Sequence, residues 1–300
     1  MIIKIKKNHI YLGIFLIIFI AFLVFFLNVD RRLILVGKNG LLTIKIPTQV
    51  EYQSALYQKN ENYTINTLQY SSFGKEIYGF LVMPNASKAI PGLVLLPGAG
   101  VDKKSELQFA KKLSQEGYAV LTIDQRGIGE TGGDVISFDE DFKSYANGDI
   151  PFQHLVIADA LAAVEVLREQ NDVDRTKIAI VGESLGGRIA IIAGAIDKDI
   201  KGVVGISTAG FHYSPKENEN SRFISSIDPD NYIASISPRR LFMFHNYYDK
   251  NVPFQSALET FGKAKKPKKF ILVNDTGCNH GFCESMFADI KSSIESIFRS

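Results

Sequence analysis

Residues 177–193 decide the fold, and they read Lys-Ile-Ala-Ile-Val-Gly-Glu-Ser-Leu-Gly-Gly-Arg-Ile-Ala-Ile-Ile-Ala. The apolar, β-branched run at 177–181 predicts a buried strand, and the apolar run after the serine predicts a helix. Ser184 falls at the sharp turn between them, and Gly182 and Gly186 carry no Cβ atoms that could clash there. The helix N-terminus beside the serine favours developing negative charge. The stretch therefore predicts a nucleophilic serine, the alternative being a glycine-rich turn without chemistry.

A serine hydroxyl is a poor nucleophile near neutral pH, so a base must lie within hydrogen-bond reach of it. His280 follows a predicted strand at 270–274 and begins the last predicted helix. The carboxyl ends of parallel strands are where such sheets present functional groups. This position favours His280 as the base over the other four histidines, which are His9, His154, His212 and His245.

The base in turn needs an acid that orients it. Asp249 stands just past the predicted strand at 240–245, so it would lie at the same edge of the sheet as His280. Asp228 and Asp230 are weaker rivals because they lie in a polar insertion. A serine, acid and histidine in this chain order are typical of a hydrolase sheet with a nucleophile elbow. The predicted catalytic triad is Ser184, Asp249 and His280.

A tetrahedral intermediate requires hydrogen-bond donors aimed at its oxyanion. The Leu185 backbone N–H lies next to the serine at the predicted helix start. The second donor is expected from the glycine-rich loop at 96–100, where glycines permit a close approach of the backbone. We expect Ala99 N–H in this role, with Gly100 N–H in reserve; a turn without a ligand is the alternative.

Strands and helices alternate along most of the chain, which predicts an α/β fold with a mostly parallel sheet flanked by helices. A polar segment at 210–238 with interspersed aromatic side chains interrupts the alternation. We interpret it as a cap-like insertion, the alternative being a disordered surface loop. The predicted strands lie at 63–70, 76–83, 92–96, 118–123, 177–181, 202–206, 240–245 and 270–274.

Together these pieces resemble the α/β-hydrolase superfamily, specifically its dienelactone-hydrolase-like and prolyl-oligopeptidase-like serine esterase branch. The resemblance covers residues 63–300, and the segments that carry it are 95–100, 117–129, 182–186, 249–253 and 279–282. It implies an eight-stranded sheet and the triad predicted above. The family often has His-Gly where this chain has Pro97-Gly98. Dienelactone hydrolase itself has a cysteine nucleophile, and the peptidase relatives carry a propeller domain, so the resemblance favours a serine esterase.

The N-terminus departs from an ordinary globular composition. Residues 10–27 form an almost unbroken apolar run without a charge, which is long enough to span a bilayer as a helix. A cleaved signal peptide is the competing interpretation, but no Ala-x-Ala-like site follows the run. We expect an N-terminal transmembrane helix within a 1–30 anchor, a linker or small hairpin at 31–62, and a catalytic domain outside the cytoplasm.

The remaining composition bounds the partners. A net charge of +2 gives no argument for nucleic acid, and the lysine-rich run at 263–269 lacks aromatic residues between its charges. Cys278 and Cys283 flank His280; they are poor evidence for a zinc site and could be either a disulfide or two reduced thiols. We expect no metal or organic cofactor.

Three functions remain open from the sequence. The first is a membrane-anchored serine hydrolase that cleaves a carboxylic ester of a small-molecule or acyl substrate through an acyl-enzyme. The second is acyl-peptide or amide hydrolysis at the same site. The third is a non-catalytic hydrolase-fold module that binds at a membrane surface. Neither the substrate's identity nor the oligomeric state follows from the sequence.

Overall fold

The computed structural model describes residues 33–46, 49–86, 88–214 and 218–299. All of these residues except Leu33 belong to a compact unit that begins at Ile34. Within the described ranges, none of the helices combines the length and the apolarity that crossing a bilayer requires. The predicted membrane helix at 10–27 lies outside the described residues.

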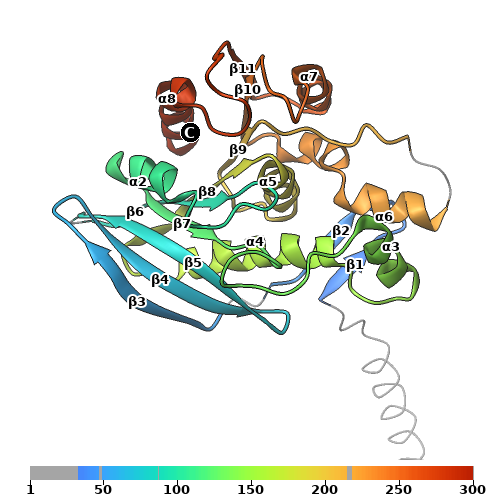
Figure 1. The fold of residues 1–300 in the computed structure, drawn as a ribbon, viewed down its shortest axis with the longest axis horizontal. Helices are drawn as coiled ribbons and strands as arrows, with labels where there is room; N and C mark the ends of the chain where they lie inside the picture. Colours follow the sequence, from blue (N-terminus) through green and yellow to red (C-terminus); the bar gives the residue numbers. More distant parts are fainter. Residues whose placement is uncertain (1–32, 47–48, 87, 215–217, 300) are drawn as a thin grey trace, which may run out of the picture. The chain divides into compact units, whose positions relative to one another are not determined.

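A mixed sheet of nine strands forms the centre of the unit, in the order β11-β10-β9-β8-β6-β7-β5-β4-β3 (Figure 1). The strands from β7 to β11 in this order pair in parallel, and β3, β4 and β5 extend the sheet through antiparallel pairs. The bounds are β3 Tyr52–Lys59, β4 Tyr63–Ser72, β5 Lys75–Pro84, β6 Ile90–Leu96, β7 Ala119–Ile123, β8 Val173–Glu183, β9 Gly202–Ile206, β10 Arg240–Asn246 and β11 Lys268–Val273.

The predicted mostly parallel α/β sheet is therefore confirmed, but the expected count of eight strands is wrong. The ninth strand is β3, which pairs along the edge of the sheet with β4. Nearly all of its side chains are exposed, so it lacks the apolar alternation by which a half-buried strand is recognised. The sheet consequently begins within the segment that was expected to be a linker or small hairpin.

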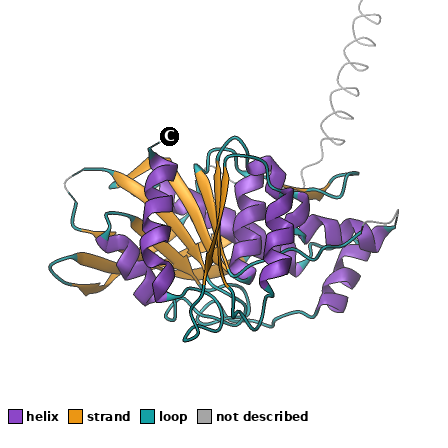
Figure 2. Cartoon of the chain, turned by 90° about the horizontal axis from the view of Figure 1, so that it is seen from above, coloured by secondary structure: helices purple, strands orange, loops and turns teal. Residues whose placement is uncertain are grey.

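Helices cover both faces of the sheet (Figure 2). Alternate residues of the central strands point to opposite faces: Val94 and Ile180 join the core under α4, α5 and α7, whereas Leu95 and Val181 join the core under α2 and α8. Both faces are thus buried, as is usual for parallel strands. The helices are α2 Leu107–Gln115, α4 Phe152–Arg168, α5 Leu185–Ile196, α7 Phe254–Lys263 and α8 Phe287–Phe298.

A separate two-stranded sheet precedes the main one. Its strands, β1 (Ile34–Val36) and β2 (Leu42–Ile44), pair antiparallel. The Leu42 N–H donates a hydrogen bond of 2.7 Å to the Tyr232 hydroxyl, and the buried side chains of β1 and β2 extend the core on the α4 and α5 side. This hairpin is therefore tied to the insertion that follows β9.

The described part of the 210–238 insertion is folded and packed. It contains α6 (Glu219–Ile227) and the short 3-10 helices η1 (Pro229–Asn231) and η2 (Ile233–Ile236). Phe223 of α6 is fully buried, and its ring meets aromatic side chains of α3 (Phe138–Ala146), which lies beside α6 (Figure 1). The described residues therefore do not form a loose surface loop, while a capping role stays a prediction.

Candidate active site

Ser184 occupies a strained turn between β8 and α5. Its backbone has φ 50° and ψ −114°, which a non-glycine residue rarely adopts, and such strain concentrates at functional positions. A Cβ added at Gly182 would lie 2.2 Å from the Gly186 carbonyl oxygen, and one at Gly186 would lie 2.2 Å from the Leu96 carbonyl oxygen. Both glycines are therefore required by the close approach of α5 to β8 and β6.

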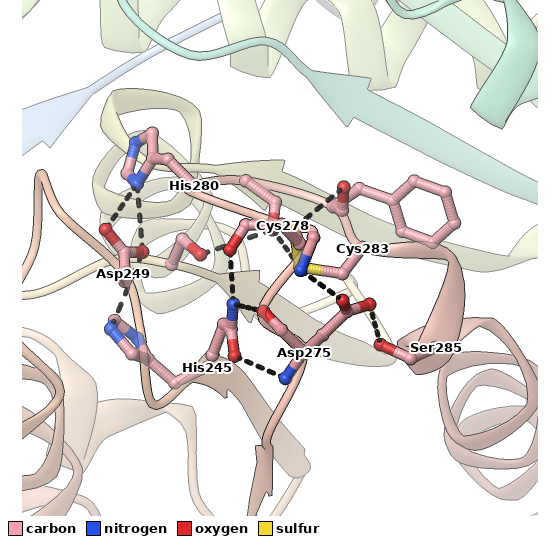
Figure 3. The surroundings of a disulfide bond; sticks show 12 residues. His245, Asp249, Asp275, Cys278, His280, Cys283 and Ser285 are labelled. Carbon is pink, nitrogen blue, oxygen red and sulfur yellow. Dashed lines mark hydrogen bonds and ion pairs between the residues drawn. A yellow bond between two sulfur atoms is a disulfide. The ribbon is translucent and has the colours of Figure 1, made fainter.

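Asp249 and His280 are brought into direct contact (Figure 3). The His280 Nδ1 lies 2.9 Å from each carboxylate oxygen of Asp249. Nδ1–H therefore donates to the carboxylate, which assigns the tautomer in which Nε2 can accept a proton. The Asp249 side chain is fully buried, whereas His280 is partly exposed.

Hydrogen-bond donors surround the Asp249 carboxylate. The backbone N–H groups of Asn251 and Val252 each donate to it at 2.9 Å, and the Ser207 hydroxyl shares its one proton between this carboxylate and the Gly281 carbonyl. Burial raises the pKa of Asp249, but the hydrogen bonds from His280, Val252, Asn251 and Ser207 outweigh it and hold the pKa below its ordinary value. Asp249 is therefore ionised at neutral pH and can stabilise a positively charged imidazole.

The predicted site residues follow the carboxyl ends of neighbouring parallel strands. Ser184 follows β8, Asp249 follows β10 and His280 follows β11, and these strands lie in the order β11-β10-β9-β8. Ser207, directly after β9, contacts the His280 loop by donating to the Gly281 carbonyl at 3.3 Å. Within the described chain, no hydrogen bond joins the Ser184 hydroxyl to the His280 imidazole. The structure thus brings together two members of the predicted triad and places the third at the same sheet edge.

The two predicted oxyanion donors flank Ser184. Leu185 is the first residue of α5, and the loop of Ala99 turns beside the serine, since a Cβ at Gly98 would lie 3.5 Å from the Ser184 Cβ. Neither the Leu185 N–H nor the Ala99 N–H donates to any described protein acceptor. Both remain available to a ligand.

A buried ion pair that sequence reasoning missed anchors the Ala99 loop. Lys103 is almost fully buried; its backbone N–H donates to Asp124 at 2.7 Å, and its ammonium group contacts the carboxylates of Asp124 and Glu130. Gln125 donates to the Pro97 carbonyl at 2.7 Å. The loop after β6 is therefore fixed to the loop after β7. In the sequence, Asp124 and Gln125 were noticed only as part of the 117–129 segment that resembles the hydrolase family, and their contacts with the Ala99 loop were not predicted.

A second missed feature is a pair of carboxyl groups behind the serine. Glu106 lies just before α2, Glu183 is the last residue of β8, and their side chains are hydrogen-bonded to each other. Burial first, and then the charge and the hydrogen bond of Glu183, raise the pKa of Glu106 to about 9. Glu183 also accepts the Phe282 N–H at 2.8 Å. Sequence spacing gave no signal, because the two residues meet only once β6 and β8 pair.

Cys278 and Cys283 form a disulfide that encloses the His280 loop (Figure 3). Of the two interpretations left open by the sequence, the structure has the disulfide, with the two Cα atoms 5.7 Å apart. The Asn246 side chain donates to the carbonyls of Cys278 and Asp275, at 2.6 and 2.8 Å. The disulfide therefore closes the loop, and the hydrogen bonds from Asn246 hold the loop against the end of β10.

The rival residues have other partners. His154 is buried against Ser226, and burial lowers the pKa of His154 to about 3, so it is neutral. His212 and Lys263 both contact Asp230. Asp228 accepts the Phe211 N–H. His245 Nε2 donates to the Val252 carbonyl at 2.8 Å and lies 3.6 Å from Asp249 Oδ2, so it contacts the predicted acid from the side away from His280 (Figure 3). Among the described histidines, only His280 donates a hydrogen bond to Asp249.

A hollow of about 840 Å³ lies at the opposite edge of the sheet. Residues at the end of α4 and at the start of β8 line it, including Arg168 and Val173. The length of β8 separates this hollow from Ser184. In the described ranges, no group of three or more histidine, cysteine or acidic side chains could hold a metal ion.

The sheet and the serine turn define an α/β hydrolase of the serine esterase type. The chain belongs to the acetyl xylan esterase (AXE1) family, whose model matches residues 43–212. The model for the C-terminal region of BAAT / acyl-CoA thioester hydrolases matches residues 161–285. The predicted resemblance to the serine esterase branch is therefore confirmed, and the matching families indicate a serine hydrolase of the esterase type.

Individual proteins are also similar to this chain in sequence or in fold. The chain is 27% identical over 197 residues to the uncharacterized protein YfhR of Escherichia coli K12; the match covers 63% of each protein, which is less than two thirds of that relative's length. The acetyl xylan esterase from Paenibacillus sp. R4 has a TM-score of 0.69 and 21% identity, over 83% of this chain and 89% of that one. A cold-adapted esterase from an Arctic intertidal metagenomic library has a TM-score of 0.61 and 21% identity, over 82% and 98%. At this identity the structural likenesses show the fold alone.

Proposed function

We propose that this serine hydrolase cleaves carboxylic esters through an acyl-enzyme at Ser184, with His280 as the base and Asp249 as the orienting acid. The observation that carries the proposal is the pair of hydrogen bonds between His280 Nδ1 and the buried Asp249 carboxylate. This contact leaves Nε2 as the basic nitrogen, at the sheet edge where β8 presents Ser184.

The proposed reaction follows from these roles. His280 Nε2 takes the Ser184 proton as the hydroxyl oxygen attacks the ester carbonyl, and the N–H groups of Leu185 and Ala99 donate to the oxyanion. The imidazolium then gives its proton to the leaving alcohol oxygen, and the acyl group stays on the serine. Water attacks the acyl-enzyme with the same imidazole as base. Asp249 remains ionised throughout, because its pKa is held low.

The substrate class is proposed from the family names. Acetyl xylan esterases are named for an acetyl ester, which supports a short acyl group on a hydroxyl-bearing substrate. The match to the acyl-CoA thioester hydrolase region, which includes all three proposed triad residues, favours thioesters as the second candidate. Acyl-peptide and amide hydrolysis lacks a comparable match in these two families.

A substrate panel separates these candidates. The full-length protein in detergent is given p-nitrophenyl acetate, acetylated xylo-oligosaccharide, acetyl-CoA and an aminoacyl p-nitroanilide, beside Ser184→Ala. We expect the highest kcat/KM on the oxygen esters and the loss of turnover in Ser184→Ala. A higher kcat/KM on acetyl-CoA would replace the ester proposal by the thioester one, and unchanged turnover in Ser184→Ala would remove the proposed nucleophile.

We also propose that residues 10–27 anchor the enzyme in a lipid bilayer, with the catalytic domain outside the cytoplasm. The support is the uncharged apolar run in the sequence and the disulfide at the active site, since disulfides persist in oxidising compartments. Protease added to sealed, right-side-out vesicles should digest the catalytic domain. Protection that ends only when detergent is added would place the domain in the cytoplasm.

A further inference from the structure

Three segments of the proposed active site meet at one pair of acidic side chains. Glu106 belongs to the segment between the Ala99 loop and α2, and Glu183 directly precedes Ser184. Glu183 Oε2 accepts the N–H of Phe282, which lies two residues after His280, at 2.8 Å. A Cβ placed on Gly281 would lie 2.6 Å from the same oxygen, so the His280 loop is in tight contact with this carboxyl group.

The two carboxyl groups can touch only while one of them keeps a proton. Glu106 is 5% exposed. The ionisable groups that act on the pair are the two carboxyl groups themselves and the His280 imidazole. Glu183 accepts from both Glu106 and Phe282, so Glu106 is the member that donates a proton to the shared hydrogen bond. Burial raises the pKa of Glu183 as well, but the hydrogen bonds that Glu183 accepts from Phe282 and Glu106 oppose this rise, so Glu183 is the member of the pair that ionises first.

We propose that Glu106 and Glu183 are positioning residues, which share one proton and thereby hold the His280 loop, the Ser184 turn and the segment after the Ala99 loop in register. The inference rests on the proposed triad and adds two residues that act through it. Removing the shared proton puts two negative charges in contact, which drives the Glu106 segment away from Glu183 and loosens the Phe282 contact. The active site then loses the spacing between its serine and its histidine.

The first test is the pH dependence of kcat on p-nitrophenyl acetate between pH 6 and pH 10.5, after subtraction of the spontaneous hydrolysis. Wild type should lose kcat as the pH passes about 9, where Glu106 gives up its proton. Glu106→Gln keeps a neutral donor of the same shape, so its kcat should stay level through this range. A decline in Glu106→Gln at the same pH as in wild type would overturn the proposal.

Asp141→Asn is the matched control. Asp141 is also a buried carboxyl group with a raised pKa, and it accepts the N–H groups of Phe152 and Gln153 at the start of α4. It contacts neither Glu106 nor Glu183. We expect the alkaline decline of wild type to persist in Asp141→Asn. Loss of the decline in this control would show that any buried carboxyl group controls it, which contradicts the proposal.

The second test separates positioning from folding. Glu183→Leu removes the acceptor for the Phe282 N–H and should lower kcat about 10- to 100-fold at pH 7.5, with a smaller change in KM. Glu183→Gln keeps an acceptor oxygen and should recover most of this loss. Wild-type kcat in Glu183→Leu, or no recovery in a folded Glu183→Gln, would overturn the proposal.

The outcomes also distinguish this inference from the proposed function. If Ser184→Ala is inactive and Glu106→Gln still declines as wild type does, only the positioning role fails. If Ser184→Ala retains full activity, the proposed triad fails first, whatever the pH profiles show.

Discussion

The His280 loop is held by carboxyl groups on two sides, and the two sides differ in charge state. On one side Asp249 is surrounded by N–H and O–H donors, which hold its pKa below the ordinary value even though the side chain is buried. On the other side Glu106 faces another carboxyl group, and burial raises its pKa to about 9. Burial alone therefore does not decide the charge; the number of donors that face the carboxyl oxygens does.

Because their charge states differ, the two carboxyl groups have different roles. An ionised Asp249 can stabilise the imidazolium that forms during acylation. A protonated Glu106 can donate a hydrogen bond, which a carboxylate cannot do. The two sides also respond to pH in opposite ranges: Asp249 loses its favourable contacts as acid protonates it, whereas the Glu106–Glu183 contact fails in alkali.

The largest effect is expected from Asp249→Asn, which removes the charge from the first side. An amide cannot hold the same imidazole tautomer, so kcat should fall about 10⁴-fold while the fold persists. Steady-state kinetics on p-nitrophenyl acetate, with circular dichroism as the check on folding, measures this. A fall in kcat of less than tenfold would show that the negative charge of Asp249 is not needed to stabilise the His280 imidazole.

The sequence could predict those active-site residues whose role is marked by their immediate neighbours in the chain. The turn at Ser184 was predictable because the two glycines, the serine and the apolar run of the following helix are consecutive in the sequence. Asp249 and His280 were found because each follows a recognisable strand. Glu183 looked like a variable position of the serine motif, and its partner Glu106 lies in a distant segment. Their contact depends on the pairing of β6 with β8, which the sequence does not show residue by residue.

The exposed strand β3 was missed for a related reason. Its side chains face solvent, so no apolar periodicity marks it, and its pairing with β4 fixes its position. The membrane interpretation of residues 10–27 rests on the sequence, since they lie outside the described ranges.

A smaller effect, on stability, is expected from Glu106→Gln. The unfolded chain releases this proton near the ordinary glutamate pKa, whereas the folded chain keeps it up to about pH 9. The folded state therefore binds more protons in this window, and its stability falls as the pH rises, by at most about 1.4 kcal/mol per pH unit. Glu106→Gln removes this slope. Urea unfolding at pH 6, 7 and 8 measures it, and equal slopes in the variant and wild type would contradict a protonated Glu106.

The smallest effect is expected from opening the disulfide beside Asp249. Cys278→Ser with Cys283→Ser frees a short loop, so the free energy of unfolding should fall by about 2 kcal/mol. The hydrogen bonds from Asn246 and Ser207 still hold the loop, so kcat should fall only several-fold. Thermal unfolding and ester turnover with and without reductant measure both quantities. A complete loss of activity in a folded variant would mean that the disulfide, and not the carboxyl groups, positions His280.

The most direct test of the proposed catalytic triad is covalent labelling with a fluorophosphonate, followed by intact-mass and peptide analysis. Wild type should gain one phosphonyl group on Ser184. Ser184→Ala should gain none, and Asp249→Asn should react far more slowly than wild type. Absence of label on folded wild type, or label on another residue that persists in Ser184→Ala, would contradict the account.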